Sequence, residues 1–294
     1  MQLQHIIMGT RYKRAKSFFE DIQNKTYAHI KGEALSIQAY GCTGHRVFSD
    51  LDILLPRKEL ADFERILKDN EFYTTLQSRQ DKIMMLSSSH QTAPWVKNIE
   101  PWGQLNIDLN FDIFWGEYTG KRIDIAEFLS DAMEIEIYGC RIKTLPPIKA
   151  MVQLILHHYK DMNSIFLLAT RKSIRYNMFK DVYHLLKNNL DTIALDKLYA
   201  MSTRYEIIPY VYYILYYTAI LFKDEFLREY IEAFKTPVGE ELLNCYGLNK
   251  SERREWRVDF QTRLESSSLY ELIKDDLTSD DLEKIAINKR VFLG

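Results

Sequence analysis

The sequence predicts an α+β protein, in which a small mixed sheet with flanking helices is followed by an all-α C-terminal domain. Between residues 28 and 145, short segments with the alternation typical of strands are interspersed with helical segments. After Leu145, Pro146 and Pro147, apolar residues recur at helical spacing almost to the end of the chain. We therefore expect two domains, residues 1–145 and residues 146–294, with the helical domain closing a cleft.

The first domain is expected to begin with a helix over residues 12–26, capped by Thr10. A short helix over 33–39 should end at Gly41, and an amphipathic helix should cover 57–69. The expected strands cover residues 28–31, 48–55, 71–77, 82–87, 104–113 and 134–143, and the last segment turns at Gly139 as a hairpin. Helices of the second domain are expected over residues 147–163, 173–188, 193–203, 206–222, 226–235, 239–246 and 279–287.

Composition narrows the class of protein. The 294 residues are 46% hydrophobic with a net charge of −2, which fits a globular chain and disfavours bulk DNA or RNA as a partner. The three cysteines, Cys42, Cys140 and Cys245, have no zinc-site spacing and are odd in number, so reduced thiols in a cytoplasm are expected. No signal peptide is visible, and the apolar run at 207–222 is shorter than the roughly 20 residues of a membrane span.

A pair of acidic residues, Asp50 and Asp52, lies inside the apolar run from Val47 to Leu55. On a strand, the two side chains project from one face with their Cα atoms roughly 6.6 Å apart. Such carboxylates repel each other unless cations hold them, and a pair of hard divalent metal ions is the usual solution in phosphoryl or nucleotidyl transfer. The alternative is a strand end at which both groups face water.

The residues before this strand are suited to binding phosphate. Gly32 allows the backbone to approach a ligand, and the N–H groups at the start of the next helix point at anions. A third acid is expected from residues 104–113, where Asp108 and Asp112 share one face of the strand. Asp108 is preferred because it lies mid-strand, and Asp112 is the competitor. A half-exposed strand with ordinary polar residues outward is the alternative.

The helical domain contains two polar residues on apolar faces. His158 falls beside Met151, Leu154 and Ile155, and Asp181 falls on the stripe of Ile174, Met178 and Leu185. A buried carboxylate needs a partner, so a His158–Asp181 contact that locks two helices is one interpretation. The other is that His157, Arg175 or Asp181 reaches the cleft and holds the base, ribose or acceptor.

Several of these segments resemble the DNA polymerase beta-type nucleotidyltransferase superfamily, and within it a bacterial nucleotidyltransferase family found in biosynthetic clusters. The resemblance rests on residues 30–35, Tyr40, Arg46, residues 49–55 and residues 107–109. It implies a palm-like sheet, Mg²⁺ ions and an NTP donor. Two positions depart from the pattern: Glu33 stands where the superfamily usually has Gly or Ser, and Asn110 where relatives often carry His.

The leading hypothesis is a cytoplasmic, Mg²⁺-dependent nucleotidyltransferase that moves NMP from an NTP, with ATP preferred, to a hydroxyl or amine of a small molecule or peptide. Asp50, Asp52 and Asp108 would hold one ion, and Asp50 and Asp52 a second, with Mn²⁺ as a substitute. Gly32 and Ser49 would bind phosphate, while Lys31 and Arg46 would neutralise charge. The alternatives are a toxin-like nucleotidyltransferase acting on RNA or protein, and a non-catalytic nucleotide-binding partner.

Overall fold

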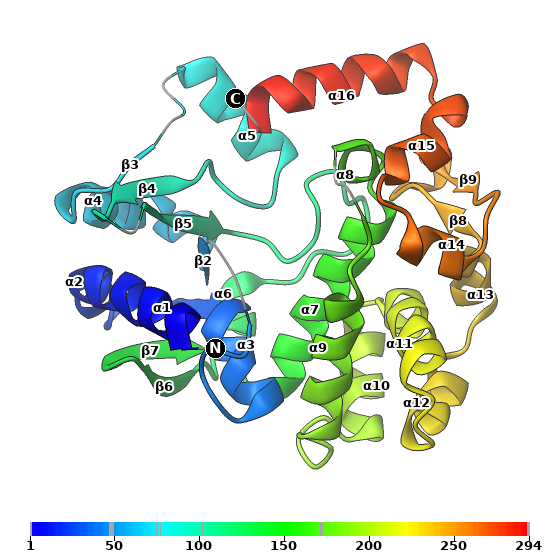
Figure 1. The fold of residues 1–294 in the computed structure, drawn as a ribbon, viewed down its shortest axis with the longest axis horizontal. Coiled ribbons are helices and arrows are strands. Elements are labelled where there is room, and N and C mark those ends of the chain that lie inside the picture. Colours follow the sequence, from blue (N-terminus) through cyan, green and yellow to red (C-terminus); the bar gives the residue numbers. More distant parts are fainter. Residues whose placement is uncertain are drawn as a thin grey trace. The chain divides into compact units, whose positions relative to one another are not determined.

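A seven-stranded mixed sheet organises the first part of the chain (Figure 1). The computed structural model describes residues 2–46, 50–74, 76, 78–101, 103–170 and 173–292. The strands lie in the order β3-β4-β5-β2-β1-β7-β6. Their bounds are β1 Ala28–Ile30, β2 Asp50–Leu54, β3 Tyr73–Thr74, β4 Trp95–Asn98, β5 Gln104–Asn110, β6 Met133–Ile137 and β7 Cys140–Thr144. The acidic strand β2 is therefore central, parallel to β5 and antiparallel to β1.

Side-chain alternation on β2 and β5 gives the sheet two chemically different faces. Leu51, Ile53, Ile107 and Leu109 are fully buried and belong to one hydrophobic core. Helices α1 (Gln2–Arg14), α2 (Lys16–Asp21) and α4 (Leu60–Asp69) contribute their apolar residues to the same core. The intervening residues, which include the acids, point away from that core. Three further helices of this region are α3 (Gly32–Tyr40), α5 (Arg79–Ser88) and α6 (Ile125–Phe128).

The N-terminal helical region differs from the prediction of one helix over 12–26. It consists of α1 and α2, and Thr10 lies inside α1, where its Oγ1 donates a hydrogen bond to the carbonyl oxygen of Ile6 at 2.9 Å. The first helix is held by Met8 and Tyr12, which are spaced one turn apart and buried at 4% and 0% exposure. Burial of this face thus extends the helix toward the N-terminus, over residues for which the sequence pattern predicted no helix.

The predicted strand over 82–87 is wrong, because these residues form part of helix α5. The Oγ of Ser78 accepts a hydrogen bond from the backbone N–H of Asp81 and caps the helix. A short apolar run, here residues 83–86, does not distinguish a strand from a helix by itself. Strand β4, which pairs with β5, was not predicted, and the predicted strand 104–113 ends at Asn110.

The chain divides into two compact units, one of Met1–Gly116 with Arg122–Ala150 and one of Glu117–Lys121 with Met151–Gly294. The second unit is mainly helical, as expected. Its helices are α7 Pro147–Asn163, whose first turn lies in the first unit, α8 Ile165–Thr170, α9 Tyr176–Lys187, α10 Leu195–Arg204, α11 Ile208–Phe222, α12 Phe226–Phe234, α13 Pro237–Leu243, α14 Phe260–Glu265, α15 Leu269–Ile273 and α16 Ser279–Phe292.

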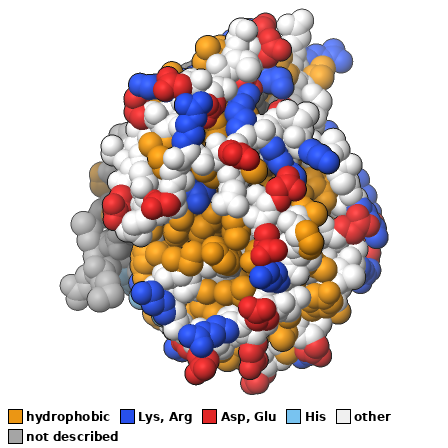
Figure 2. All heavy atoms as spheres, turned by 90° about the vertical axis from the view of Figure 1, so that its right-hand side faces the viewer, with side chains coloured by type: hydrophobic (Ala, Val, Ile, Leu, Met, Phe, Trp, Pro, Cys, Tyr) orange, Lys and Arg blue, Asp and Glu red, His pale blue; other side chains and the backbone are white. Residues whose placement is uncertain are grey.

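The second unit also contains a feature that the all-α prediction missed. Strands β8 (Cys245–Tyr246) and β9 (Arg254–Glu255) form a small antiparallel sheet, so the helix expected over 239–246 ends at Leu243. Seven of the 15 residues of helix α11 are buried. Within the described residues, no helix is long and apolar enough to cross a membrane. Figure 2 shows hydrophobic side chains gathered over part of one face of the molecule.

Candidate active site

The parallel pairing of β2 with β5 brings three carboxylates together. Asp52 lies directly opposite Asp108 in the register, and Asp50 precedes Asp52 on the same side of its strand. One carboxylate oxygen from each of the three residues lies within 4.8 Å of the other two. Asp52 and Asp108 are buried, at 6% and 8% exposure, while Asp50 is half-buried. Three oxygen donors at this spacing have the geometry of a site for a hard divalent cation.

The electrostatics of the cluster favour a bound cation. Burial, and then the charges of Asp52 and Asp50, raise the pKa of Asp108 to about 7. Lys31 opposes this shift, and its Nζ lies 2.8 Å from Oδ1 of Asp52 in an ion pair that is largely shielded from solvent. The lysine thus supplies a positive charge to the acidic cluster. A proton on Asp108 or a bound metal ion would further reduce the repulsion among the three acids.

Two amide side chains that were not predicted as site residues form hydrogen bonds with the acids. Asn110 Nδ2 donates a hydrogen bond to Asp52 Oδ1 at 3.2 Å, and Gln91 Nε2 donates to Asp108 Oδ2 at 3.4 Å. Because an ionised carboxylate only accepts, the amide nitrogens must face it. Asn110 lies on the same strand face as Asp108, and this spacing in the sequence could have identified it. No sequence pattern identifies Gln91, since it reaches β5 through an isolated bridge to Asn110.

The turn between β1 and α3 directs Lys31 toward the acids. Lys31 and Gly32 both have positive φ angles, 58° and 46°. Gly32 adopts this conformation easily, whereas for Lys31 it is a strained conformation of the kind concentrated at functional sites. Gly32 begins α3, whose first-turn N–H groups are the donors that the sequence predicted to face phosphate.

The carboxylate of Glu33, the first departure from the expected pattern, has specific protein partners. Glu33 is fully buried. Its Oε2 accepts a hydrogen bond from the Gly44 backbone N–H, and its Oε1 accepts one from the Tyr138 hydroxyl, both at 2.8 Å. Burial and this hydrogen bond raise the pKa of Tyr138, which keeps the phenol protonated as a donor. Glu33 therefore ties the loop after α3 to the β6–β7 turn.

Of the other residues predicted to bind phosphate, Arg46 is half-buried at the end of the described loop that Glu33 anchors. Ser49 and the start of the apolar run, Val47 and Phe48, lie outside the described residues.

The sequence matches a protein family described as "Uncharacterised nucleotidyltransferase" over residues 15–223. The chain belongs to this family. The match extends from α2 to the end of α11 and includes all three acids. No match is found among curated proteins. A solved structure, the solution structure of the antibiotic-resistance factor ANT(2'')-Ia, aligns with 70% of this chain and 94% of its own, at 12% identity and a TM-score of 0.34.

Behind the acids of the nucleotidyltransferase, a buried network fixes the backbone of β2. His29 Nδ1 lies 2.9 Å from the carbonyl oxygen of Asp52, and His29 Nε2 lies 2.6 Å from the Tyr12 hydroxyl. Burial lowers the pKa of His29, so the ring is neutral. A carbonyl can only accept, so Nδ1 carries the proton and Nε2 accepts from Tyr12, whose own pKa is raised by burial. The N-terminal helix is thereby linked to a metal-ligand candidate.

Asp112, the competitor for the third acid, has other protein partners in the nucleotidyltransferase. It follows the end of β5, forms an ion pair with Arg122, and accepts a hydrogen bond from the backbone N–H of Phe114 at 2.9 Å. The shared strand face that made Asp112 an alternative to Asp108 is lost when the strand ends at Asn110. Asp112 instead fastens the loop that follows.

The residues predicted to act from the helical domain lie in the second unit. Asp181 on α9 is buried at 3% exposure, His158 on α7 is buried at 5%, and Arg175 is exposed at the start of α9. His157 forms an ion pair with Asp161, one turn further along α7, at 3.3 Å. The burial of His158 and Asp181 fits either interpretation, and a role of His157, Arg175 or Asp181 in substrate binding stays a prediction.

Proposed function

We propose that this nucleotidyltransferase transfers an NMP group from an NTP, ATP first among the candidates, to a hydroxyl or amine of a small molecule or peptide. The observation that carries the proposal is the convergence of Asp50, Asp52 and Asp108 on one point of the sheet. The donor set is entirely oxygen, which suits Mg²⁺, or Mn²⁺ in its place. Two such ions, when bound, would activate the acceptor and stabilise the leaving pyrophosphate.

The protein groups have separate proposed tasks. Asp50 and Asp52 would hold both cations, and Asp108 would complete the ligands on the acceptor side. In the transfer, the acceptor oxygen or nitrogen bonds to the α-phosphorus, the bond to the bridging oxygen of pyrophosphate breaks, and the acceptor proton passes to solvent. Lys31 forms an ion pair with Asp52, and it would pair with phosphate once a cation replaces it at that carboxylate. Gly32, Ser49 and Arg46 contact the phosphate groups.

Calorimetry tests the nucleotide site without knowledge of the acceptor. A non-hydrolysable NTP analogue is titrated with and without Mg²⁺ into the wild-type protein and into the variants Asp50→Asn and Asp52→Asn. Metal-dependent binding should be lost in both variants, because each removes a ligand of both ions. The exposed Asp191 in the second unit provides a matched control, and Asp191→Asn should bind as the wild type does. Undiminished metal-dependent binding in both site variants would refute the proposal.

A labelling experiment identifies the donor and the acceptor class. Each of the four NTPs, labelled either at the α- or at the γ-phosphate, is incubated with the protein, Mg²⁺ and a cell extract. Transfer of the α-label alone is expected, since NMP is the transferred group. Label in a small molecule or peptide supports the proposed acceptor, whereas label in RNA or a large protein replaces it with the toxin-like alternative. Tight nucleotide binding with no transfer would favour a non-catalytic partner.

A further inference from the structure

Helix α7 carries a second group of metal-ligand side chains, chemically distinct from the aspartate cluster. One ligand atom from each of His157, His158 and Asp161 lies within 4.8 Å of the other two. His158 and Asp161 are buried at 5% and 7% exposure, and His157 is half-buried. All three residues lie in the second unit, and none of them belongs to the aspartate cluster of the first unit.

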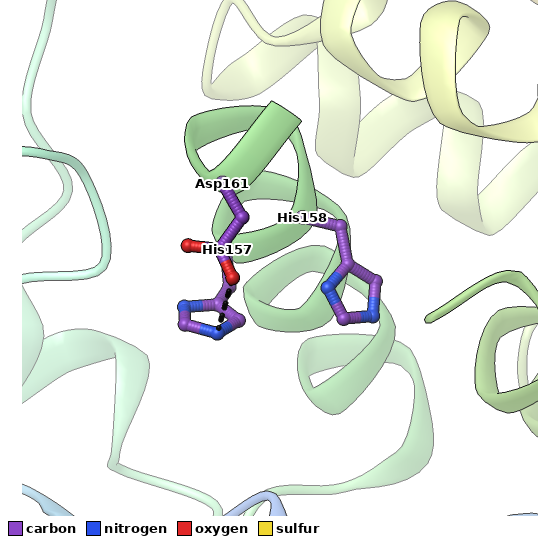
Figure 3. Close-up of side chains that lie close together, drawn as sticks. All are labelled: His157, His158 and Asp161. Carbon is purple, nitrogen blue, oxygen red and sulfur yellow. Dashed lines mark ion pairs between the residues drawn. The ribbon is translucent and has the colours of Figure 1, made fainter. Parts of the chain in front are cut away.

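The spacing on the helix explains why these side chains converge. Asp161 is four residues after His157 and three residues after His158, so it is a surface neighbour of both histidines. Side chains on a helix lean toward its N-terminus, which brings the Asp161 carboxylate over the turn that carries the histidines. Figure 3 shows His157 and Asp161 side by side, joined by their ion pair, while His158 projects from the adjacent position of the same helix.

We propose that His157, His158 and Asp161 bind one divalent transition-metal ion of the Zn²⁺ class. Two imidazoles and one carboxylate are a ligand set that suits borderline ions such as Zn²⁺, Co²⁺ and Ni²⁺, whereas the all-oxygen aspartate cluster suits Mg²⁺. Ligands of a tetrahedral zinc ion lie roughly 3.4 Å apart. Side-chain rotations that move the ligand atoms by about an ångström would bring them to this spacing. Solvent supplies the fourth ligand.

Neighbouring charge sets the strength of this binding. Lys160 Nζ lies 3.8 Å from Oδ1 of Asp161, so an ammonium group competes with a cation for the same carboxylate. Each histidine must offer an unprotonated nitrogen to the metal, so affinity should fall as the pH is lowered. Removal of the ammonium should have the opposite effect and strengthen metal binding.

Absorption spectroscopy of bound Co²⁺ tests the site separately from nucleotide transfer. The full-length protein, free of a histidine tag and carrying Cys42→Ser to remove an exposed thiol, is titrated with Co²⁺ in excess Mg²⁺. We expect one equivalent of Co²⁺ with the intense visible bands of tetrahedral coordination, displaced by Zn²⁺. The bands should persist in the Asp52→Asn background, because the aspartate cluster is not involved.

Variants of the helix decide between a built site and adventitious binding. His157→Phe, which keeps the ring volume, and Asp161→Asn, which keeps the shape, should each weaken Co²⁺ binding at least about tenfold. Lys160→Met should strengthen it, and Asp191→Asn should leave it unchanged. Zn²⁺ should also raise the melting temperature of the wild type more than that of Asp161→Asn. Absence of tetrahedral bands, their loss in Asp52→Asn, or wild-type affinity in His157→Phe would overturn the proposal.

Discussion

At the scale of single residues, the acid at the centre of the site titrates near neutral pH. The pKa of Asp108 is about 7 because the carboxyl is buried beside Asp52 and Asp50. In the unfolded chain an aspartate titrates near about 3.9. Between these values the folded protein binds more protons than the unfolded chain. The metal-free fold is therefore most stable at low pH in this window and loses stability as the pH rises from about 4 to about 7.

A pH series of urea denaturations in EDTA measures this effect. We expect the free energy of unfolding of the wild type to decline toward pH 7 relative to that of Asp108→Asn, because the asparagine cannot ionise. Mg²⁺ affinity should show the opposite trend and rise up to about pH 7, since binding requires the ionised acid. A difference between the two proteins that does not change with pH would contradict the assignment of this titration to Asp108.

Asp108 and Asp112 should respond differently to alanine. Asp108→Ala should abolish transfer while NTP binding persists, because its proposed metal lies on the acceptor side. Asp112→Ala should keep turnover but lower the melting temperature, since it removes the ion pair with Arg122 and the hydrogen bond from the Phe114 N–H, at a cost of about 0.5–1.5 kcal/mol. Turnover assays and thermal melts of both variants check this, and loss of turnover in Asp112→Ala alone would reverse the assignment.

At the scale of elements, the loop after α3 is held by Glu33 through two separate donors. Glu33→Gln keeps the size of the side chain but leaves one acceptor oxygen for two donors. If this anchor positions Arg46, the KM for NTP should rise while kcat changes little. Tyr138→Phe, which removes only one of the two hydrogen bonds, should raise KM less. Steady-state kinetics of the two variants are the measurement, and equal KM values in all three proteins would show that the anchor is purely structural.

Helices α7 and α9 bury His158 and Asp181, each within an apolar stripe. Asp181→Asn removes the charge with little change in volume. If Asp181 locks the helices, the melting temperature should fall, in line with about 1–3 kcal/mol for an imperfectly satisfied buried group. NTP affinity should then be unaltered, and we expect this outcome. A variant that melts like the wild type but binds NTP at least about tenfold more weakly would place Asp181 in substrate recognition.

At the scale of the whole molecule, ligands that bind only the folded state should stabilise it together. A ligand at 100 times its Kd adds about 2.7 kcal/mol to the free energy of unfolding. Mg²⁺ with an NTP analogue should therefore raise the melting temperature more than either alone, because the triphosphate supplies further oxygen ligands to the ions. The increase should vanish in Asp52→Asn and survive in Asp191→Asn. Thermal melts that shift equally in both variants would place the ligand elsewhere.

The sequence by itself determined several local features of this protein, namely the strand faces on which side chains lie and the bounds of one helix. Strand periodicity placed Asp50 with Asp52 on one face of β2 and Asp108 with Asp112 on one face of the next predicted strand, and the mid-strand position favoured Asp108. Helical spacing and Pro147 located α7 from its first residue to its last. These inferences hold because side-chain direction in a strand or helix depends only on the order of residues.

Only the tertiary structure decided which distant residues those local features contact. The parallel register that sets Asp52 opposite Asp108, and the amides of Asn110 and Gln91 that hold them, depend on pairing between distant segments. The same holds for Glu33, whose carboxylate faces Gly44 and Tyr138, and for residues 82–87, where a helix replaced the predicted strand. Burial and pairing partners are properties of the folded chain, and local pattern does not encode them.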